Sequence, residues 1–205
     1  MFNNIEQFSN TFSKIKKYIK VEKPETVLLD YGGPNIGKPL HVGHLRSLNI
    51  GRSLYHMYKL AGHNVLSDIH IGDWGMPIAQ IITYIEEKQI NIENINIGDL
   101  EKIYPEASKL YVENDEFKKI AQANNKRLNE NDSKIFNKWK KLKKISVKSI
   151  KETLKALNHS FDFWMGESDV NHLIPEMIQK LESEGKISID AGAYVSNLVS
   201  EPKIL

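Results

Sequence analysis

Apolar positions near the start of the chain recur first with the spacing of a strand and then with that of a helix. Residues 26–31 form a short β-branched and apolar run, which predicts a buried strand. Residues 32–40 contain three glycines and two prolines, a composition that excludes regular structure. Residues 41–60 then carry apolar side chains at helical spacing, and Gly62 is placed to cap the end of that helix.

The same order of elements then recurs. Residues 64–71 predict a second strand, residues 72–75 (Gly-Asp-Trp-Gly) a turn, and residues 76–87 a second helix. Strand, helix and strand in this order make a βαβ unit, whose strands are parallel and whose ligands bind beyond their carboxyl ends. We therefore expect the loops at residues 32–41 and 72–75 to face one crevice.

The pattern after residue 88 favours polar helices joined by loops. The expected elements are a loop at residues 89–99, helices at 106–127, 133–157 and 172–184, and a small hairpin at 186–196. A short amphipathic helix is also expected at residues 1–20. The fold class is thus α/β, with a Rossmann-like parallel βαβ half, a mostly helical α+β insertion and the second Rossmann half missing. The expected divisions are an N-terminal extension (1–23), the first part of the Rossmann domain (24–88) and the insertion (89–205).

Composition excludes several classes of protein. With 40% apolar and 26% charged residues, the chain is typical of a soluble globular protein. It has no apolar run of the roughly 20 residues that cross a bilayer, and its first residues lack the apolar core of a secretory signal. The absence of cysteine excludes disulfides, a thiolate zinc site and a cysteine nucleophile. We therefore expect a cytoplasmic protein without a membrane partner. The net charge of +2 is too small to identify a binding partner.

The strongest local pattern is His41-Val42-Gly43-His44, at the start of the predicted helix. The first turn of a helix offers free N–H groups and a partial positive charge, which attract phosphate. Histidines three residues apart lie on one face of that turn, and Gly43 removes a side chain where a nucleotide would pack. Such groups stabilise charge that develops on a phosphorus centre. The alternative is that two unrelated histidines cap a helix.

In its wider context, this pattern resembles a known family. Residues 31–47 resemble the first signature of class I aminoacyl-tRNA synthetases, and the arginyl-tRNA synthetases are the best match. The matching motif residues are Pro34, Asn35, Ile36, Gly37, Lys38, Pro39, Leu40, His41, Val42, Gly43 and His44. The Gly-Asp-Trp-Gly at 72–75, the Phe-Trp-Met-Gly-Glu-Ser at 163–168 and the Gly-Ala-Tyr at 192–194 are also similar to this family. The chain would then be the N-terminal part of the catalytic domain with its insertion.

The resemblance implies a reaction centre for ATP. His41, His44 and Lys38 would be the catalytic residues, and these three with Gly43 would bind ATP. Many arginyl enzymes place a lysine just before the histidines in place of one from a later loop, and Lys38 occupies that position. The alternative for Lys38 is an ordinary surface lysine. ATP would be a substrate that carries its own Mg²⁺, and no protein-bound metal site is expected.

The resemblance also implies a pocket for arginine. Asp30 and Asn35 would hold the α-amino end, and Glu167 would face the guanidinium, where a bidentate pair discriminates against lysine. The alternatives are a strand-terminal turn for Asp30, an Asx-turn for Asn35 and a solvated loop acid for Glu167. Asp73 is a further candidate, with helix capping as its alternative. For the neighbouring Trp74 we favour structural support.

The implied activity is arginine–tRNA ligation: arginine and ATP form arginyl-adenylate, and tRNA-Arg accepts the arginine. The partners would be tRNA-Arg, L-arginine and ATP, and the full-length enzyme would be a monomer. Because a second Rossmann half and an anticodon-binding domain are missing, we expect the chain alone to be inactive or very weak. A stand-alone His-x-Gly-His nucleotidyltransferase and a non-catalytic paralogue that binds arginine or tRNA remain alternatives.

The lysine-rich segment 138–144 has two equally weighted interpretations. It could be a basic stripe for tRNA phosphates. It could equally be the solvated face of an amphipathic helix whose Trp139, Leu142 and Ile145 point inward.

Overall fold

The computed structural model describes residues 19–190, 193–196 and 203–204, together with residues 5, 9, 10 and 14. Apart from those isolated positions and residues 19–20, the helix predicted for residues 1–20 lies outside the described residues. The chain forms two compact units, Met1–Gly166 and Glu167–Leu205. In the described part of the chain, no helix combines the length and the apolarity needed to cross a bilayer.

The first unit contains a sheet of three parallel strands. β1 (Thr26–Asp30) pairs with β2 (Asn64–Ile71), and β2 pairs with β3 (Phe163–Gly166). The register places Asp30 beside Asp68 and Asp68 beside Phe163. Because β3 comes from the segment predicted to be an insertion, the chain returns to the sheet after its helices. The predicted α/β fold with a parallel βαβ unit is confirmed.

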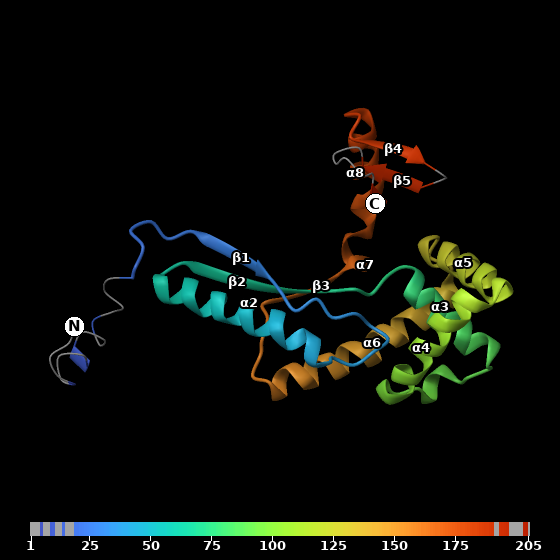
Figure 1. Cartoon of the computed structure of the whole chain (residues 1–205), viewed down its shortest axis with the longest axis horizontal. Coiled ribbons are helices and arrows are strands. Elements are labelled where there is room, and N and C mark those ends of the chain that lie inside the picture. Colours follow the sequence, from blue (N-terminus) through green and yellow to red (C-terminus); the bar gives the residue numbers. More distant parts are fainter. Residues whose placement is uncertain are drawn as a thin grey trace. The chain divides into compact units, whose positions relative to one another are not determined.

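One face of this sheet is covered by α2 (Val42–Ala61) and α6 (Ser133–Ala156) (Figure 1). Ile69 of β2 packs there against Leu48 of α2 and against Ile150 and Leu154 of α6, and all four side chains are buried. Gly62 ends α2 in the left-handed conformation, with φ of 99°, as the sequence predicts.

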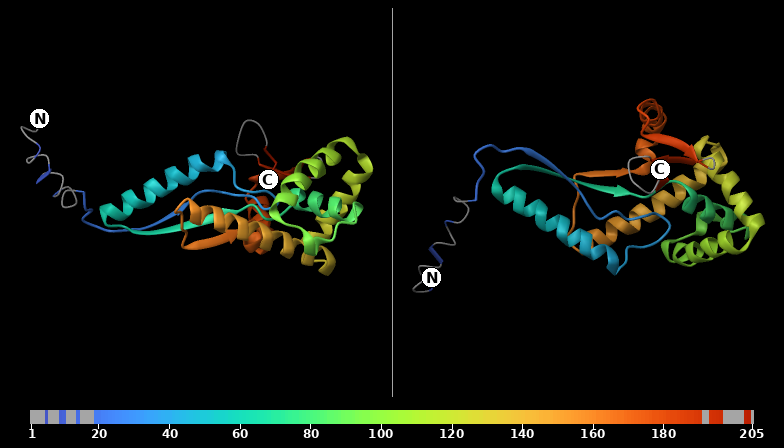
Figure 2. Two further views of the ribbon diagram at one scale, coloured as in Figure 1. Left: turned by 90° about the horizontal axis from the view of Figure 1, so that it is seen from below. Right: turned by 45° about the horizontal axis from the view of Figure 1, so that its top comes forward.

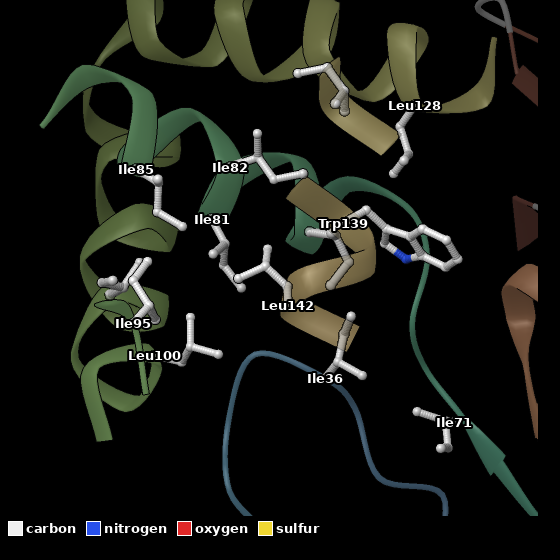
Figure 3. Close-up of a cluster of buried hydrophobic side chains, with 13 residues drawn as sticks. Ile36, Ile71, Ile81, Ile82, Ile85, Ile95, Leu100, Leu128, Trp139 and Leu142 are labelled. Carbon is white, nitrogen blue, oxygen red and sulfur yellow. The ribbon is translucent and has the colours of Figure 1, made fainter. Parts of the chain in front are cut away.

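The other helices described between residues 19 and 166 gather beyond the carboxyl end of β2 (Figure 2). They are α3 (Met76–Glu87), the 3₁₀ turn η1 (Ile92–Asn94), α4 (Ile97–Glu113) and α5 (Asp115–Asn129). Figure 3 shows isoleucines of α3 packed among Leu100, Leu128, Trp139 and Leu142, with Ile36 reaching in from the loop after β1. This core therefore ties the glycine-rich loop to the helical part of the unit.

Three predicted elements need correction. The helix predicted at residues 106–127 is two helices, because Asn114 ends α4 and its side chain accepts hydrogen bonds from the Glu116 and Phe117 N–H groups at the start of α5. The loop predicted at residues 89–99 contains η1 and the first turn of α4. The strand predicted at residues 26–31 ends at Asp30.

The second unit is small. It contains α7 (Glu167–Val170), the 3₁₀ turn η2 (Asn171–Leu173), α8 (Ile174–Ser183) and an antiparallel sheet. The sheet has the order β4 (Ile187–Asp190), β5 (Ala193–Ser196) and β6 (Lys203–Ile204). The predicted hairpin is thus confirmed and gains a third strand. The domain boundary expected at residue 88 stays a prediction.

Candidate functional site

The two predicted loops lie side by side at the carboxyl ends of β1 and β2. Asn35 forms a parallel bridge with Gly72. The Ile36 N–H donates to the Gly72 carbonyl at 3.0 Å, and the Gly72 N–H donates to the Pro34 carbonyl at 2.9 Å. A Cβ atom on residue 72 would lie 1.9 Å from the Asn35 Oδ1, so only glycine allows this approach.

A buried serine of α6 fixes the next residue of the first loop. The Gly37 N–H donates to the Ser146 Oγ at 3.0 Å, and Ser146 is fully buried. Gly37 has φ of 89°, and a Cβ atom there would lie 2.5 Å from the Ile81 Cδ1. The loop is thus held by Ser146 of α6 and packed against Ile81 of α3 immediately before Lys38.

The two histidines of the motif cap α2 together. The His41 Nδ1 accepts from the Gly43 N–H at 3.1 Å, and the His44 Nδ1 accepts from the His41 N–H at 3.2 Å. A Cβ atom on residue 43 would lie 2.8 Å from the His41 ring, so Gly43 permits the cap. The two histidines therefore do cap the helix, and their role toward ATP stays a prediction. When its Nδ1 accepts in this way, the neutral His41 ring carries its N–H at Nε2, where it can donate to a ligand. The His44 Nδ1 also lies 3.3 Å from the His41 carbonyl, so it accepts from the His41 N–H in one tautomer and donates to that carbonyl in the other.

Partial burial and the neighbouring His41 lower the pKa of His44, and the charge of Lys38 adds to this effect, so the ring is mainly neutral near pH 7. A hydrogen bond with the His41 backbone offsets only part of this lowering of the pKa. The two imidazole centroids are 4.1 Å apart. The Lys38 Nζ lies 5.2 Å from the centre of the Tyr104 ring of α4, which holds this ammonium by a cation–π contact.

Asp30 and Asn35 are exposed at the end of β1 and in the loop that follows, next to the Gly72 bridge. Their predicted contact with the α-amino end of arginine is compatible with this position and stays a prediction.

Asp73 has a different environment from the other predicted acids. It is fully buried, its Oδ2 lies 2.5 Å from the Lys143 Nζ, and its carbonyl accepts from the Trp139 Nε1 at 2.6 Å. The helix-capping alternative is wrong, because Gly75 is the N-cap of α3 and no side chain caps it. Asp73 therefore ties the second loop to α6.

Trp74 connects the same loop to α5 and α6. Its Nε1 donates to the Asn129 Oδ1 of α5 at 2.8 Å, and its ring meets the Trp139 ring edge to face at 5.3 Å. These contacts agree with the structural role that the sequence favours for Trp74.

Comparison with known proteins identifies the family of this chain. The family model described as "tRNA synthetases class I (R), catalytic domain" matches residues 7–202. The chain belongs to the class I arginyl-tRNA synthetase family. The resemblance noted in the sequence is thereby confirmed.

Curated arginyl-tRNA synthetases share about a third of this sequence. The arginine–tRNA ligase of Agathobacter rectalis is 36% identical over 190 residues, which are 86% of this chain and 32% of that relative. The ligase of Yersinia enterocolitica is 35% identical over 193 residues, or 89% of this chain and 34% of the relative. The chain therefore spans about a third of the length of the curated relatives it matches.

Solved arginyl-tRNA synthetases have the same fold. The Plasmodium falciparum enzyme superposes with a TM-score of 0.67 at 26% identity, over 91% of this chain and 33% of that structure. The Thermus thermophilus enzyme gives a TM-score of 0.61 at 20% identity, over 95% of this chain and 35% of that structure, a likeness of fold alone.

The lysine-rich segment of this arginyl-tRNA synthetase family member is largely engaged with acids. Lys138 pairs with Glu86, Lys141 with Glu93 and Lys143 with Asp73. Trp139 and Leu142 are buried, as the amphipathic interpretation requires, while Lys140 and Lys144 are exposed. The structural interpretation gains support, and contact with tRNA stays a prediction.

Glu167 is the first residue of α7 and is exposed, at the start of the second unit. Its predicted role toward the guanidinium stays a prediction, since it belongs to the other unit from Asn35 and His44.

The sequence predicts that Trp139 points inward, but it did not show that Trp139 and Ser146 of α6 contact the two loops. The buried face of this helix carries Ile135, Trp139, Leu142, Ser146, Ile150 and Leu154. A serine in the middle of an otherwise apolar stripe was the available signal, because a buried hydroxyl needs a hydrogen-bond partner.

Proposed function

We propose that this chain builds the first wall of a site at which an arginine–tRNA ligase activates arginine with ATP and transfers it to tRNA-Arg. The observation that carries this proposal is the histidine pair that caps α2 beside Lys38, within a chain of the arginyl-tRNA synthetase family. The proposal places the protein in the cytoplasm, where tRNA is charged.

The chemistry follows from where negative charge develops. A carboxylate oxygen of arginine attacks the α-phosphorus of ATP, a new P–O bond forms, and the bond to the departing pyrophosphate breaks. The Nε2–H group of His41, that of His44 in the tautomer whose Nδ1 accepts, and the free N–H groups of the first turn of α2 stabilise that charge, and no covalent enzyme intermediate is needed. Lys38 contributes a compact positive charge to the phosphates. The Mg²⁺ arrives with ATP as part of the substrate.

Arginine itself would be held at its two ends. Asp30 and Asn35 would bind the α-ammonium group beside the reacting carboxylate. Glu167 would pair with the guanidinium through two parallel hydrogen bonds, which an ammonium side chain cannot match.

The proposal is tested by ATP binding to this chain, measured by isothermal titration calorimetry. We expect His41→Ala and His44→Ala each to weaken ATP binding by about tenfold, the loss of one charge-assisted hydrogen bond. His63→Ala, beyond the opposite end of α2, is the matched control and should bind ATP as the unmodified chain does. Equal ATP affinity in all four proteins would remove the histidine pair from the ATP site.

A further inference from the structure

A small polar cavity lies between the middle of α2 and the segment that follows α6. Its volume is about 170 Å³, and its lining includes Tyr31, Arg52, Tyr55, His56, Asn158 and His159. None of the histidines or the lysine of the proposed ATP site lines it. Arg52 follows His44 by eight residues, which corresponds to roughly 12 Å along the helix. The cavity is therefore separate from the proposed ATP site.

The lining carries positive charge and hydrogen-bond donors. Arg52 supplies a guanidinium with five N–H donors, of which the Nη1–H is directed to the Leu157 carbonyl at 3.3 Å. His56 and His159 add two imidazoles, and no Asp or Glu lines the cavity. The acid nearby is Asp162, whose Oδ2 already accepts from the Ser67 N–H and the Ser67 hydroxyl, both at 2.8 Å.

His159 is the least satisfied group of this lining. It is 7% exposed, and its Nδ1 has no hydrogen-bond partner among the described residues. Buried polar atoms are nearly always paired, so an orphaned imidazole nitrogen beside a cavity points to a partner outside the chain. Burial and the charge of Arg52 lower the pKa of His159. An anion in the cavity would offset the charge of Arg52 and so favour the protonated form of His159.

The walls of the cavity are fixed before any ligand arrives. The Tyr31 ring packs on the backbone of Gly51, where a Cβ atom would lie 2.1 Å from it, and its centroid is 4.7 Å from that of Phe161. Burial raises the pKa of the Tyr31 phenol, which therefore stays a donor at neutral pH. On the other side, Asn158 adopts φ of 57°, and the His159 N–H donates to the Leu154 carbonyl at 2.8 Å.

We propose that this cavity binds a small oxyanion, a phosphate or carboxylate group, through the Arg52 guanidinium and the imidazoles of His56 and His159. A planar guanidinium fork matches both groups. The volume suits one such group and is smaller than the roughly 300 Å³ at which pockets for whole drug-sized ligands begin. The site is independent of the proposed function.

The test is a titration of the chain, labelled with ¹⁵N in its histidines, with inorganic phosphate and separately with acetate at constant ionic strength. The imidazole signals of His56 and His159 should shift in a saturable manner, and the anion that binds more tightly identifies the source chemistry. Arg52→Gln should weaken this binding at least tenfold. Arg46→Gln, an exposed arginine of the same helix, is the matched control and should bind normally.

The histidine signals also separate this site from the proposed ATP site. Shifts confined to His41 and His44, or no shift at any histidine, would overturn the proposal. Because Arg52 also contacts the Leu157 carbonyl, the melting temperature of Arg52→Gln must be checked. His56→Gln provides the second test, since His56 is exposed and its replacement should leave the fold intact. Unchanged phosphate and acetate binding in both variants would also overturn it.

Discussion

Gly72 decides how closely the two loops of the candidate site approach each other. Its missing side chain leaves room for the Asn35 Oδ1, and the two residues bridge the ends of β1 and β2. The sequence predicts that both loops belong to one site. The sequence could not predict that Asn35 in the first loop makes glycine necessary at position 72 in the second. That contact depends on the register of β1 and β2.

We expect Gly72→Ala to destabilise the chain by about 1–3 kcal/mol, the usual cost of forcing extra volume into a packed site. Urea denaturation measures this cost. In an Asn35→Ala background, the same change should cost much less, because the clashing oxygen is gone. Equal costs in the two backgrounds would show that Asn35 does not set the requirement for glycine at this position.

The lowered pKa of His44 also predicts how stability depends on pH. Above pH 6.5, the usual pKa of an unfolded histidine, the ring is neutral in both states and its contribution is complete. Below pH 6.5 the unfolded chain takes up a proton that the folded chain resists, so stability falls until the pH reaches the lowered folded-state pKa.

The measurement compares melting temperatures at pH 7.5 and pH 5.5. The unmodified chain should lose more stability on acidification than His44→Gln, because glutamine does not titrate. A His44→Gln variant with an undiminished difference between the two pH values would contradict the assignment.

At the scale of elements, α6 is the support that both loops share. Ser146 accepts from Gly37 in the first loop, while Trp139 and Lys143 contact Asp73 in the second. These residues come from one helix face, so a shift of α6 would move both loops together.

Ser146→Ala should cost about 1–3 kcal/mol, because it leaves the buried Gly37 N–H without its acceptor. It should also weaken ATP binding, since Lys38 follows Gly37 directly. Ser149→Ala is the control, because Ser149 lies on the same helix but is not among its buried residues. It should change the free energy of unfolding by less than about 0.5 kcal/mol. Calorimetric ATP titration separates the two effects, and normal ATP affinity in Ser146→Ala would argue against a positioning role.

Elements with strong local patterns were predictable, and those that depend on distant partners were not. Residues 64–71 and 76–87 were correctly predicted as a strand and a helix because their apolar positions repeat with the right period. Pro105 obscured α4, which continues through it from a start capped by Asn96. β3 is only four residues long and becomes a strand because β2 offers it an edge.

At the scale of the whole molecule, the described helices of the first unit leave one face of the parallel sheet uncovered. Leu28 is 60% exposed, Phe163 44% and Met165 40%, and the strand register places them on the face opposite α2 and α6. Parallel sheets in proteins are usually covered on both faces. The relatives that this chain matches are about three times as long.

We therefore predict that residues 1–205 alone do not charge tRNA at a useful rate. Adenylate formation depends on charges held around the transferring phosphorus, and in our proposal the chain supplies His41, His44 and Lys38 from one side of it. The assay uses purified chain, tRNA, ATP and radiolabelled arginine. A His41→Ala/His44→Ala preparation controls for contaminating host enzyme, and robust charging that this double variant abolishes would prove the prediction wrong.

The bond between Gly37 and Ser146 spans 109 residues of sequence, and this distance affects the order of folding. Contacts of such high sequence separation form late, because closing a long loop costs entropy before it yields an interaction. During synthesis, the loop at residues 32–41 leaves the ribosome well before α6, which carries its partner Ser146. We therefore expect this loop, and with it the proposed ATP site, to reach its final conformation only after α6 has been synthesised.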